Sequence, residues 1–301
     1  MNNEYYCGLG NHGNTCFFNS AIQSIMRCSV FITFISNLRI DSELINIFQE
    51  FIKEYKQNSG KSTSPIKLVK YYSKRNKNYS IGDQDDADEV LNILIQDIDE
   101  IIQKEINEKR IENITIKGEI KLNRMIEYLF GIIIETTIKC LKCSTKTFKK
   151  STEYKICVPI KANNLLENLD NYKVIEELKG DEQYYCEKCK TKVDALKSDQ
   201  IIKTPKYLHI QLKRFINNGQ RISKINDTVS IVPNIEIAGN NYNLRGSVHH
   251  SGSYNGGHYI YHYNKNKSNR FDDWICLDDS SISNKNVSNH INQGYVYLYV
   301  K

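Results

Sequence analysis

Long hydrophobic runs are what this sequence most clearly lacks. Apolar stretches such as residues 130–134 are far shorter than the roughly 20 residues that a membrane-spanning helix needs. The N-terminus, MNNEYYCGLG, also lacks the apolar segment of a secretory signal peptide. We therefore expect no membrane association and a location inside the cell, in the cytoplasm, the nucleus or both.

Proline is scarce, and internal repeats and low-complexity linkers are absent. The 301 residues include four prolines, 40% hydrophobic residues and 25% charged residues, a composition that excludes fibrous and disordered proteins. The net charge of +6 comes from scattered lysines and arginines, which does not favour a nucleic-acid-binding surface. We expect a single domain over residues 1–301 and a monomer.

Cysteine, by contrast, is plentiful. An odd number of cysteines without a secretory signal argues for thiols, metal ligands or a catalytic role rather than a disulfide framework. The nine are Cys7, Cys16, Cys28, Cys140, Cys143, Cys157, Cys186, Cys189 and Cys276.

One cysteine lies where a loop meets a helix. Residues 8–15 are glycine-rich and polar, and apolar residues at helical spacing follow from 17 to 26, so Cys16 stands at the helix start. Unpaired backbone N–H groups and the positive end of the helix dipole favour a thiolate there. The alternative is a buried, unreactive cysteine, since free cysteine is among the most buried residue types.

The residues before Cys16 suit a nucleophile. Gly8, Gly10 and Gly13 let the loop take positive φ values and let a substrate backbone come close. The amide of Asn11 can point at the oxygen that becomes negative when a thiolate attacks a carbonyl group, which is the role of an oxyanion-hole donor.

The first third of the chain favours helices. Apolar spacing predicts helices within residues 17–56, a loop at 57–65, a helix after Pro65, and a further helix over 81–102. Acidic residues open this last helix: Asp85, Asp86, Asp88 and Glu89. They either cap the helix and complement its dipole, or form an acidic patch for a cationic ligand tail.

From about residue 115 the sequence favours strands, because β-branched and aromatic residues dominate. A helical insert is expected at 163–178. The strand-like segments are 115–120, 129–140, 146–160, 198–215, 227–238, 241–263 and 271–283. Helices first and antiparallel strands second indicate an α+β fold with separate layers.

Four cysteines form two CxxC pairs. Cys140 pairs with Cys143 and Cys186 with Cys189, and two such knuckles supply the four sulfurs of a closed tetrahedral Zn²⁺ site. Four sulfurs leave no open coordination position, so we expect one structural zinc ion per chain, whose binding would supply folding energy. The alternatives are an empty site or a redox-active pair.

A histidine near the C-terminus can serve Cys16. His258 follows Gly256 and Gly257 at the start of an alternating strand. A nucleophilic cysteine needs an imidazole to take its proton, and the imidazole needs a partner to fix its tautomer. Asp278 or Asp279 on the following strand can be that partner, because cross-strand pairs lie about 4.5–5.5 Å apart at Cβ.

Other histidines compete for this role. His249, His250 and His262 lie in the same region, and each has a structural or solvent-facing role as its default. The glycines before His258 favour it over the others, and His250 is the better candidate for a residue of the cleft.

The motifs together resemble the ubiquitin-specific protease family of papain-like cysteine proteases over nearly the whole chain. GLGNHGNTCFFNSAIQ resembles the family's cysteine box, GDQDDADEVL its acidic helix motif, CLKC and CEKC its zinc knuckles, and VHHSGSYNGGHYIYHY with WICLDDSSIS its histidine box. The resemblance implies a hand-like fold with a helical thumb (1–114), an antiparallel β palm (115–134 and 201–301) and zinc-pinned β fingers (135–200).

The resemblance also implies roles for individual residues. Cys16 would be the nucleophile, His258 the general base and acid, Asp278 its orienting carboxylate, Asn11 the oxyanion donor and Asp279 a supporting polar residue. The implied reaction is hydrolysis of the isopeptide or peptide bond after the C-terminal glycine of ubiquitin, and the implied partners are ubiquitin chains and ubiquitinated proteins.

Substrate binding is implied for a second set of residues. Two carboxylates would contact the basic, diglycine-ended tail of ubiquitin, and the others would form a cleft too narrow for most side chains. These residues are Asp86, Glu89, His250, Gly256, Gly257 and Tyr259. Two other functions stay open at this point: a non-catalytic ubiquitin-binding scaffold of the same fold, and a thiol redox protein.

Overall fold

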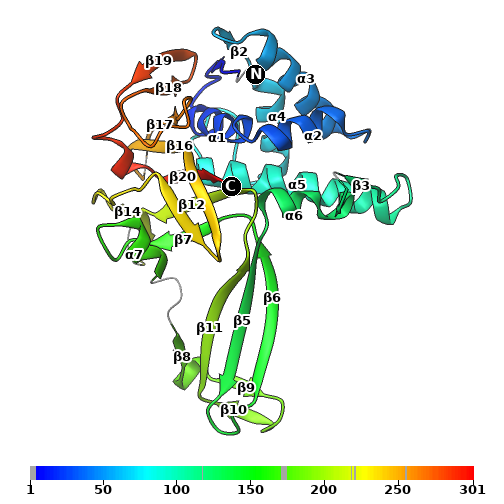
Figure 1. Cartoon of the computed structure of the whole chain (residues 1–301), viewed down its shortest axis with the longest axis vertical. Helices are drawn as coiled ribbons and strands as arrows, with labels where there is room; N and C mark the ends of the chain where they lie inside the picture. Colours follow the sequence, from blue (N-terminus) through cyan, green and yellow to red (C-terminus); the bar gives the residue numbers. More distant parts are fainter. Residues whose placement is uncertain (1–4, 117, 171–174, 218, 220–221, 255) are drawn as a thin grey trace.

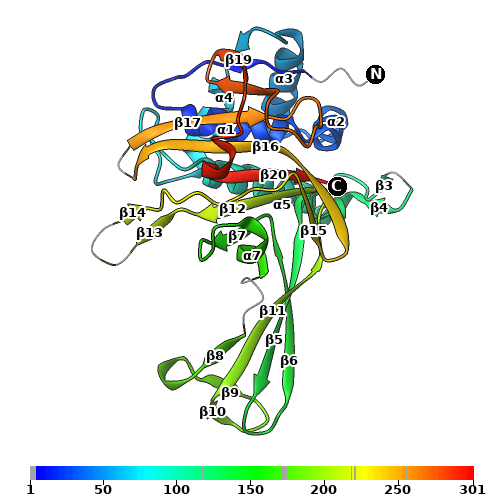
Figure 2. The same ribbon diagram turned by 60° about the vertical axis from the view of Figure 1, so that its left-hand side comes forward.

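The computed structural model describes residues 5–116, 118–170, 175–217, 219, 222–254 and 256–301. Its fold is α+β, as predicted. Helices pack on one face of a large sheet, and a narrower sheet projects from this body as a long ribbon (Figures 1 and 2).

The helical layer comes first in the chain, as expected. Its members are α1 (Cys16–Met26), α2 (Ser29–Asn37), α3 (Glu43–Gln57), α4 (Ile66–Arg75) and α5 (Ala87–Asn107). The loop before α4 contains the short strand β2 (Ser62–Thr63), which pairs in parallel with β1 (Gly8–Leu9). α5 starts later than predicted because Asp86 is its N-cap and accepts a hydrogen bond from the backbone N–H of Asp88.

The palm sheet follows late in the chain. Its strand order is β19-β18-β17-β16-β20-β12-β7, with β15 also paired to β16. Neighbours are antiparallel except for β7 and β12, which are parallel. The strands are β7 (Ile156–Pro159), β12 (Tyr207–Lys213), β15 (Asn234–Ile237), β16 (Asn240–Ser253), β17 (Gly256–Tyr263), β18 (Trp274–Asp278), β19 (Ser281–Lys285) and β20 (Val296–Val300).

The projecting ribbon has the strand order β6-β5-β11-β8 (Figure 1). A hairpin of β9 and β10 lies at its end. The side chains of β6 are mostly exposed, so the ribbon buries little apolar surface. The strands are β5 (Ile132–Cys140), β6 (Lys146–Glu153), β8 (Glu176–Leu178), β9 (Tyr184–Cys186), β10 (Thr191–Val193) and β11 (Ala195–Lys203).

Small elements complete the described chain. They are the hairpins β3 (Thr115–Ile116) with β4 (Ile120–Lys121) and β13 (Phe215–Asn217) with β14 (Ile222–Lys224), the helices α6 (Met125–Phe130) and α7 (Leu165–Asp170), and the 3-10 turns η1 (Leu122–Arg124), η3 (Gly180–Glu182) and η4 (Ile291–Gln293).

Two local predictions were wrong. Residues 129–130, predicted as strand, end helix α6, and Gly131 closes that helix by donating its N–H to the carbonyl of Glu127 at 2.7 Å. The insert at 163–178 is only partly helical: it contains α7, but Glu176–Leu178 form β8 and pair with β11. Residues 171–174 of that insert lie outside the described residues. Pairing partners distant in the sequence override local propensity at β8.

No helix in the described ranges is both long and apolar enough to cross a membrane alone. Helices α1 and α2 reach the required length and hydropathy only when combined, and they bend by 89° at their junction. The division into thumb, palm and fingers at the residue numbers given above stays a prediction.

Helix α1 lies at the centre of the body. All eleven of its residues are buried, between α5 and the palm strands β16 and β17. On the side facing β12, Ser24 Oγ lies 3.2 Å from Nε2 of His209, which is 2% exposed and stacks on Phe130. Burial lowers the pKa of His209 to about 4. A neutral imidazole therefore helps to hold the helix that carries Cys16.

We expect this histidine to make the fold sensitive to acid. The unfolded chain protonates His209 near pH 6.5, whereas the folded chain resists protonation down to about pH 4. The contribution of His209 to the free energy of unfolding is therefore fully present above pH 6.5. It is lost as the pH falls toward 4, by ~3 kcal/mol at most. Urea unfolding of the wild type and of His209→Gln over this range would measure the effect. The difference between the two proteins should shrink as the pH falls, and a constant difference would contradict the assignment.

Candidate active site

Cys16 is the first residue of α1, as predicted. Its side chain is 3% exposed, and Thr15 is the N-cap residue. The hydroxyl of Thr15 accepts a hydrogen bond from the backbone N–H of His12 at 2.9 Å, which fixes the turn before the helix. The thiol lies against palm strand β17, where it is hydrogen-bonded by the backbone of Tyr259. Tyr259 directly follows His258, so the helix start and the start of β17 meet at this point.

The protonation state of Cys16 differs from the sequence expectation. Burial raises the pKa of the thiol, and the nearby Asp279 carboxylate raises it further. Backbone hydrogen bonds from Tyr259, Phe17 and Cys16 itself act in the opposite direction but do not outweigh burial. The helix start favours the thiolate as expected, but burial outweighs it in the substrate-free protein, so a base must take the proton.

The glycines of the loop have different roles. Gly8, Gly10 and Gly13 were predicted to let the loop take positive φ values, but of these three only Gly13 has a positive φ, at 83°. Gly8 is needed for close packing, because a Cβ there would lie 2.3 Å from the carbonyl oxygen of Ser280. At Gly10 a Cβ would meet nothing closer than 3.4 Å, so neither strain nor close contact requires glycine at this position.

His258 and Asp278 form a direct pair. Nε2 of His258, on β17, lies 2.6 Å from Oδ1 of Asp278, on β18, and both side chains are nearly half exposed. A carboxylate at this distance fixes the proton on Nε2, which leaves Nδ1 as the nitrogen able to accept one. Within the described residues the Cys16 thiol and His258 share no hydrogen bond. Such contacts are often long in substrate-free enzymes and tighten when substrate binds.

Two of the competing histidines are structural. His249 and His262 lie inside the palm with their ring centres 4.5 Å apart, and they are 6% and 1% exposed. Burial lowers the pKa of both, to about 4 for His262. Ser247 Oγ lies 2.8 Å from Nε2 of His249. Neither ring is placed beside Cys16.

Asp279 and Asn11 are brought together beside Cys16. Nδ2 of Asn11 donates to Oδ2 of Asp279 at 2.8 Å, and Oδ1 of Asn11 accepts from the backbone N–H of Thr15 at 3.1 Å. These two bonds orient the Asn11 amide and leave its second N–H available. Asp279 itself has a φ of +49°, and its carbonyl accepts from the N–H of Leu9 at 2.7 Å. The turn between β18 and β19 is thereby tied to the loop before Cys16.

Asn19 is a site residue that the sequence analysis missed. It is 2% exposed, and its Nδ2 donates to Oδ1 of Asp279 at 2.7 Å and to the carbonyls of Leu9 and Gly10. Asn19 lies three residues after Cys16, and this spacing places both side chains on one face of α1. This three-residue spacing from Cys16 was the feature of the sequence that could have identified Asn19 as a site residue. A buried asparagine thus joins the helix, the loop and the β18–β19 turn.

Gln84 is a second residue that was missed. Its amide makes a reciprocal pair of hydrogen bonds with the backbone of Gly257, each 3.0 Å long. Nearby, Nδ2 of Asn14 donates to the carbonyl of Gly82 at 2.7 Å. The segment before α5 therefore bridges the Cys16 loop and the residue preceding His258. No hydrophobic period marks such a contact, so it could not be predicted from the sequence.

The chain matches the model of one known protein family. The family model described as ubiquitin carboxyl-terminal hydrolase matches residues 7–299. The chain belongs to this family. It is a cysteine-type deubiquitinase, in agreement with the sequence analysis.

Individual relatives support the same assignment. Ubiquitin carboxyl-terminal hydrolase 4 of Arabidopsis thaliana is 27% identical over 98% of this chain and 93% of its own length. Ubiquitin carboxyl-terminal hydrolase 46 of Caenorhabditis elegans is 27% identical over 95% of this chain and 81% of its length. Ubiquitin carboxyl-terminal hydrolase Usp2 of Drosophila melanogaster is also 27% identical, over 98% of this chain but 34% of the longer relative.

The residues predicted to form the cleft pack tightly around Gly257. A Cβ at Gly257 would lie 2.2 Å from both Nε2 of His250 and the carbonyl of Ser251, whereas one at Gly256 would meet only Gln84, at 3.4 Å. The ring of His250 packs against that of Tyr259 with centres 4.5 Å apart. Burial lowers the pKa of His250 to about 4. Glycine is therefore required at position 257, because a side chain there would clash with His250 and Ser251 on the neighbouring strand β16.

The two predicted tail-contacting carboxylates have different surroundings. Both oxygens of Asp86 are engaged: Oδ1 accepts from the N–H of Asp88, and Oδ2 accepts from the hydroxyl of Tyr295 at 2.6 Å. Burial raises the pKa of Asp86. Asp88 is buried and paired with Lys155. Glu89, by contrast, is exposed on the first turn of α5.

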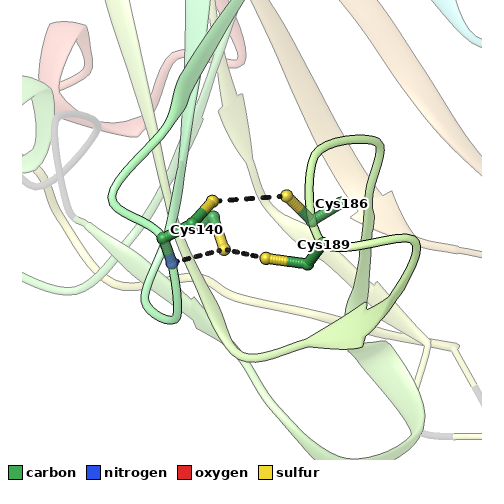
Figure 3. Close-up of side chains that lie close together, drawn as sticks. Cys140, Cys186 and Cys189 are labelled. Atoms are coloured by element: carbon green, nitrogen blue, oxygen red, sulfur yellow. Dashed lines mark hydrogen bonds between the residues drawn. The ribbon is translucent and has the colours of Figure 1, made fainter.

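The four cysteines of the CxxC pairs meet at the end of the ribbon (Figure 3). The Sγ atoms of Cys143 and Cys186 are 3.7 Å apart, and those of Cys140 and Cys189 are 4.0 Å apart. A tetrahedral ion with Zn–S bonds of about 2.3 Å separates its sulfurs by roughly 3.8 Å, so the residues fit zinc. The backbone N–H of Cys143 also donates to Sγ of Cys140 at 3.4 Å, as expected of a metal knuckle.

Proposed function

We propose that this deubiquitinase hydrolyses the isopeptide or peptide bond after the C-terminal glycine of ubiquitin, with Cys16, His258 and Asp278 as its triad. The 2.6 Å contact of His258 with Asp278, next to the buried thiol at the start of α1, is the observation that carries the proposal. The arrangement supplies a nucleophile, a base with one nitrogen available and a carboxylate that holds the base.

In the proposed mechanism, Nδ1 of His258 takes the proton from the Cys16 thiol, and the thiolate attacks the carbonyl carbon of the glycine. Asn11 Nδ2 and the Cys16 backbone N–H hold the resulting oxyanion. Collapse of the intermediate breaks the C–N bond, and protonated His258 gives its proton to the departing amine. Water then hydrolyses the thioester with His258 again as base, which restores the thiol.

The high resting pKa of Cys16 gives His258 a specific task. Because burial keeps the thiol protonated, attack is coupled to proton transfer rather than preceded by a standing thiolate. Substrate binding would then close the distance between thiol and imidazole. Asp278 stabilises the imidazolium formed at that moment.

Labelling by a ubiquitin probe with an electrophilic C-terminus tests this function. The wild type should be modified at Cys16 and should release a fluorophore from a ubiquitin C-terminal conjugate. Cys16→Ala should lose both activities while still binding ubiquitin. A second buried cysteine, Cys28, offers the control, since Cys28→Ala should still be labelled. Ubiquitin binding without labelling of the wild type would establish a non-catalytic scaffold instead.

Glu89 is the carboxylate best placed for the basic tail of ubiquitin, because it is exposed and it opens a helix beside the cleft. Asp86 already accepts two hydrogen bonds, so we propose that it supports the tail site chiefly by fixing the start of α5. Gly256, Gly257, Tyr259 and His250 would line the passage for the diglycine end.

We further propose one structural zinc ion at Cys140, Cys143, Cys186 and Cys189, which would cross-link the hairpin β9–β10 to the end of β5. We propose a thumb at 1–114, fingers within 135–200 and a palm formed by the rest. Within the fingers range, β7 belongs to the palm sheet because it pairs with β12. The nine cysteines are all unpaired, which supports a reducing compartment, the cytoplasm or the nucleus. We expect the protein to act as a monomer.

A further inference from the structure

A groove of about 1240 Å³ lies on the body away from the catalytic residues. It runs between α2, the β3–β4 hairpin and the end of β20. Helix α2, this hairpin and the C-terminal end of β20 lie toward the right of the view in Figure 2. We call it the α2 groove and define it by Val30, Phe34, Arg39, Ile114, Met125 and Val300. Ile114 is 54% exposed on its wall, so the groove opens to solvent.

The charges around the α2 groove are strongly one-sided. Six lysine and arginine side chains line it, against a single acidic side chain, that of Glu112. Arg27, Arg39 and Lys56 have no salt bridge to any carboxylate in the part of the chain that the structure describes. A concave surface lined by one sign of charge focuses its field on a ligand of the opposite sign. The six cationic residues are Arg27, Arg39, Lys56, Arg245, Lys267 and Lys301.

Arg27 is fixed in the groove with unused donors. Its guanidinium lies 4.5 Å from the ring centre of Tyr263 and 5.8 Å from that of Tyr55, and Nη2 donates to the Tyr55 hydroxyl at 2.6 Å. Nε is buried and has no hydrogen-bond partner among the described residues. A guanidinium held by stacking loses little entropy when it binds a carboxylate.

We propose that the α2 groove binds an acidic peptide segment of a partner protein, in which carboxylates alternate with bulky apolar side chains. The apolar side chains would pack against Val30, Phe34 and Ile114, and the carboxylates would pair with Arg27 and Arg39.

Nucleic acid is bound by aromatic stacking and phosphate contacts along a basic track. Three tyrosines that line the groove, Tyr55, Tyr207 and Tyr263, are almost fully buried and cannot stack on bases, whereas the aliphatic Ile114 is exposed, which favours a peptide. The proposed peptide binding is a function separate from ubiquitin hydrolysis and does not depend on it.

The groove and the catalytic residues share one helix. Cys16 is the first residue of α1, and Arg27 directly follows its last residue, Met26. The two sites are thus separated by roughly 16 Å along a buried helix. Variants for testing the groove are best taken from outside α1, so that the thiol is undisturbed.

Fluorescence polarisation of a labelled peptide with alternating glutamate and leucine residues tests the proposal on the full chain. The wild type should bind it saturably, and Arg39→Glu should weaken binding by about fivefold or more, because one attractive charge becomes repulsive. Lys70→Glu is the matched control: Lys70 is exposed on α4, outside the groove, so the same change in net charge should leave binding nearly unaltered.

Two further measurements separate a groove from a merely basic surface. Ile114→Asp should weaken binding of the same peptide, and a peptide with serine in place of leucine should bind much more weakly to the wild type. Equal effects of Arg39→Glu and Lys70→Glu, or equal binding of the serine peptide, would overturn the proposal. Tight binding of duplex DNA or of phosphatidylserine vesicles without binding of the acidic peptide would overturn it as well.

Discussion

Replacing Asn11 by alanine is expected to lower kcat for release of a fluorophore from a ubiquitin conjugate by roughly two to three orders of magnitude, the usual cost of losing one oxyanion donor. The hydrogen bonds of this amide support the proposed role. Thr15 fixes its oxygen, Asp279 holds one N–H, and the other N–H is left for the developing charge. Because the oxyanion exists only in the transition state and intermediate, KM should change little.

A neighbouring asparagine gives the control for this variant. Asn14 has a φ of +57°, so glycine tolerates the position, and Asn14→Gly removes only the bond to Gly82. Its kcat should stay within a few-fold of the wild type. If Asn11→Ala instead raised KM and left kcat unchanged, Asn11 would be a substrate-binding residue and the proposed oxyanion hole would be wrong.

The same network predicts coupling between Asn11 and Asp279. If Asp279 acts by orienting the amide, Asp279→Ala should slow hydrolysis in the wild-type background and add little to Asn11→Ala. Additive losses in the double variant would show that Asp279 acts by another route. Asn19 holds the other carboxylate oxygen of Asp279, so Asn19→Ala should reproduce part of the Asp279→Ala defect.

Residues with a local signal could be predicted from the sequence. Cys16 follows a glycine-rich loop and precedes a helical apolar period, and both features are visible within a dozen residues. The same holds for His258 after its glycines and for the two CxxC pairs. The meeting of His258 with Asp278 was predictable because adjacent strands in a hairpin are neighbours in space. The helical layer and the α+β order likewise followed from periodicity.

Contacts between distant segments could not be predicted in this way. Gln84 is hydrogen-bonded to Gly257, 173 residues away in the sequence, and Asn19 to Asp279, 260 residues away. No local sequence pattern predicts either hydrogen bond. The pKa of Cys16 was misjudged for the same reason. Helix-end effects are local and can be read from the sequence, whereas the burial that outweighs them depends on how β17 packs over α1. Strand β8 forms only because β11 offers an edge to pair with.

Replacing Cys186 by serine is expected to release the metal and unfold the end of the ribbon, while the body stays folded. Among the described residues, the small core at the end of the ribbon buries Cys140, Cys186 and Val193, which is too little apolar surface to hold a hairpin together. In small zinc modules the ion contributes about 10–16 kcal/mol of apparent binding free energy, and that energy is folding energy. The ribbon end should therefore depend on zinc far more than on its side-chain packing.

Metal analysis and hydrogen exchange together measure this effect. The wild type should contain about one zinc ion per chain, because two knuckles complete one tetrahedral site. Cys186→Ser should lose the ion and its exchange protection over β9 and β10, with protection of α1 and β17 retained. Cys157→Ser is the matched control, since Cys157 lies on β7 and contacts Gln211 rather than the cluster. Retained zinc in Cys186→Ser, or loss of protection in the body as strong as in the ribbon, would contradict a local structural site.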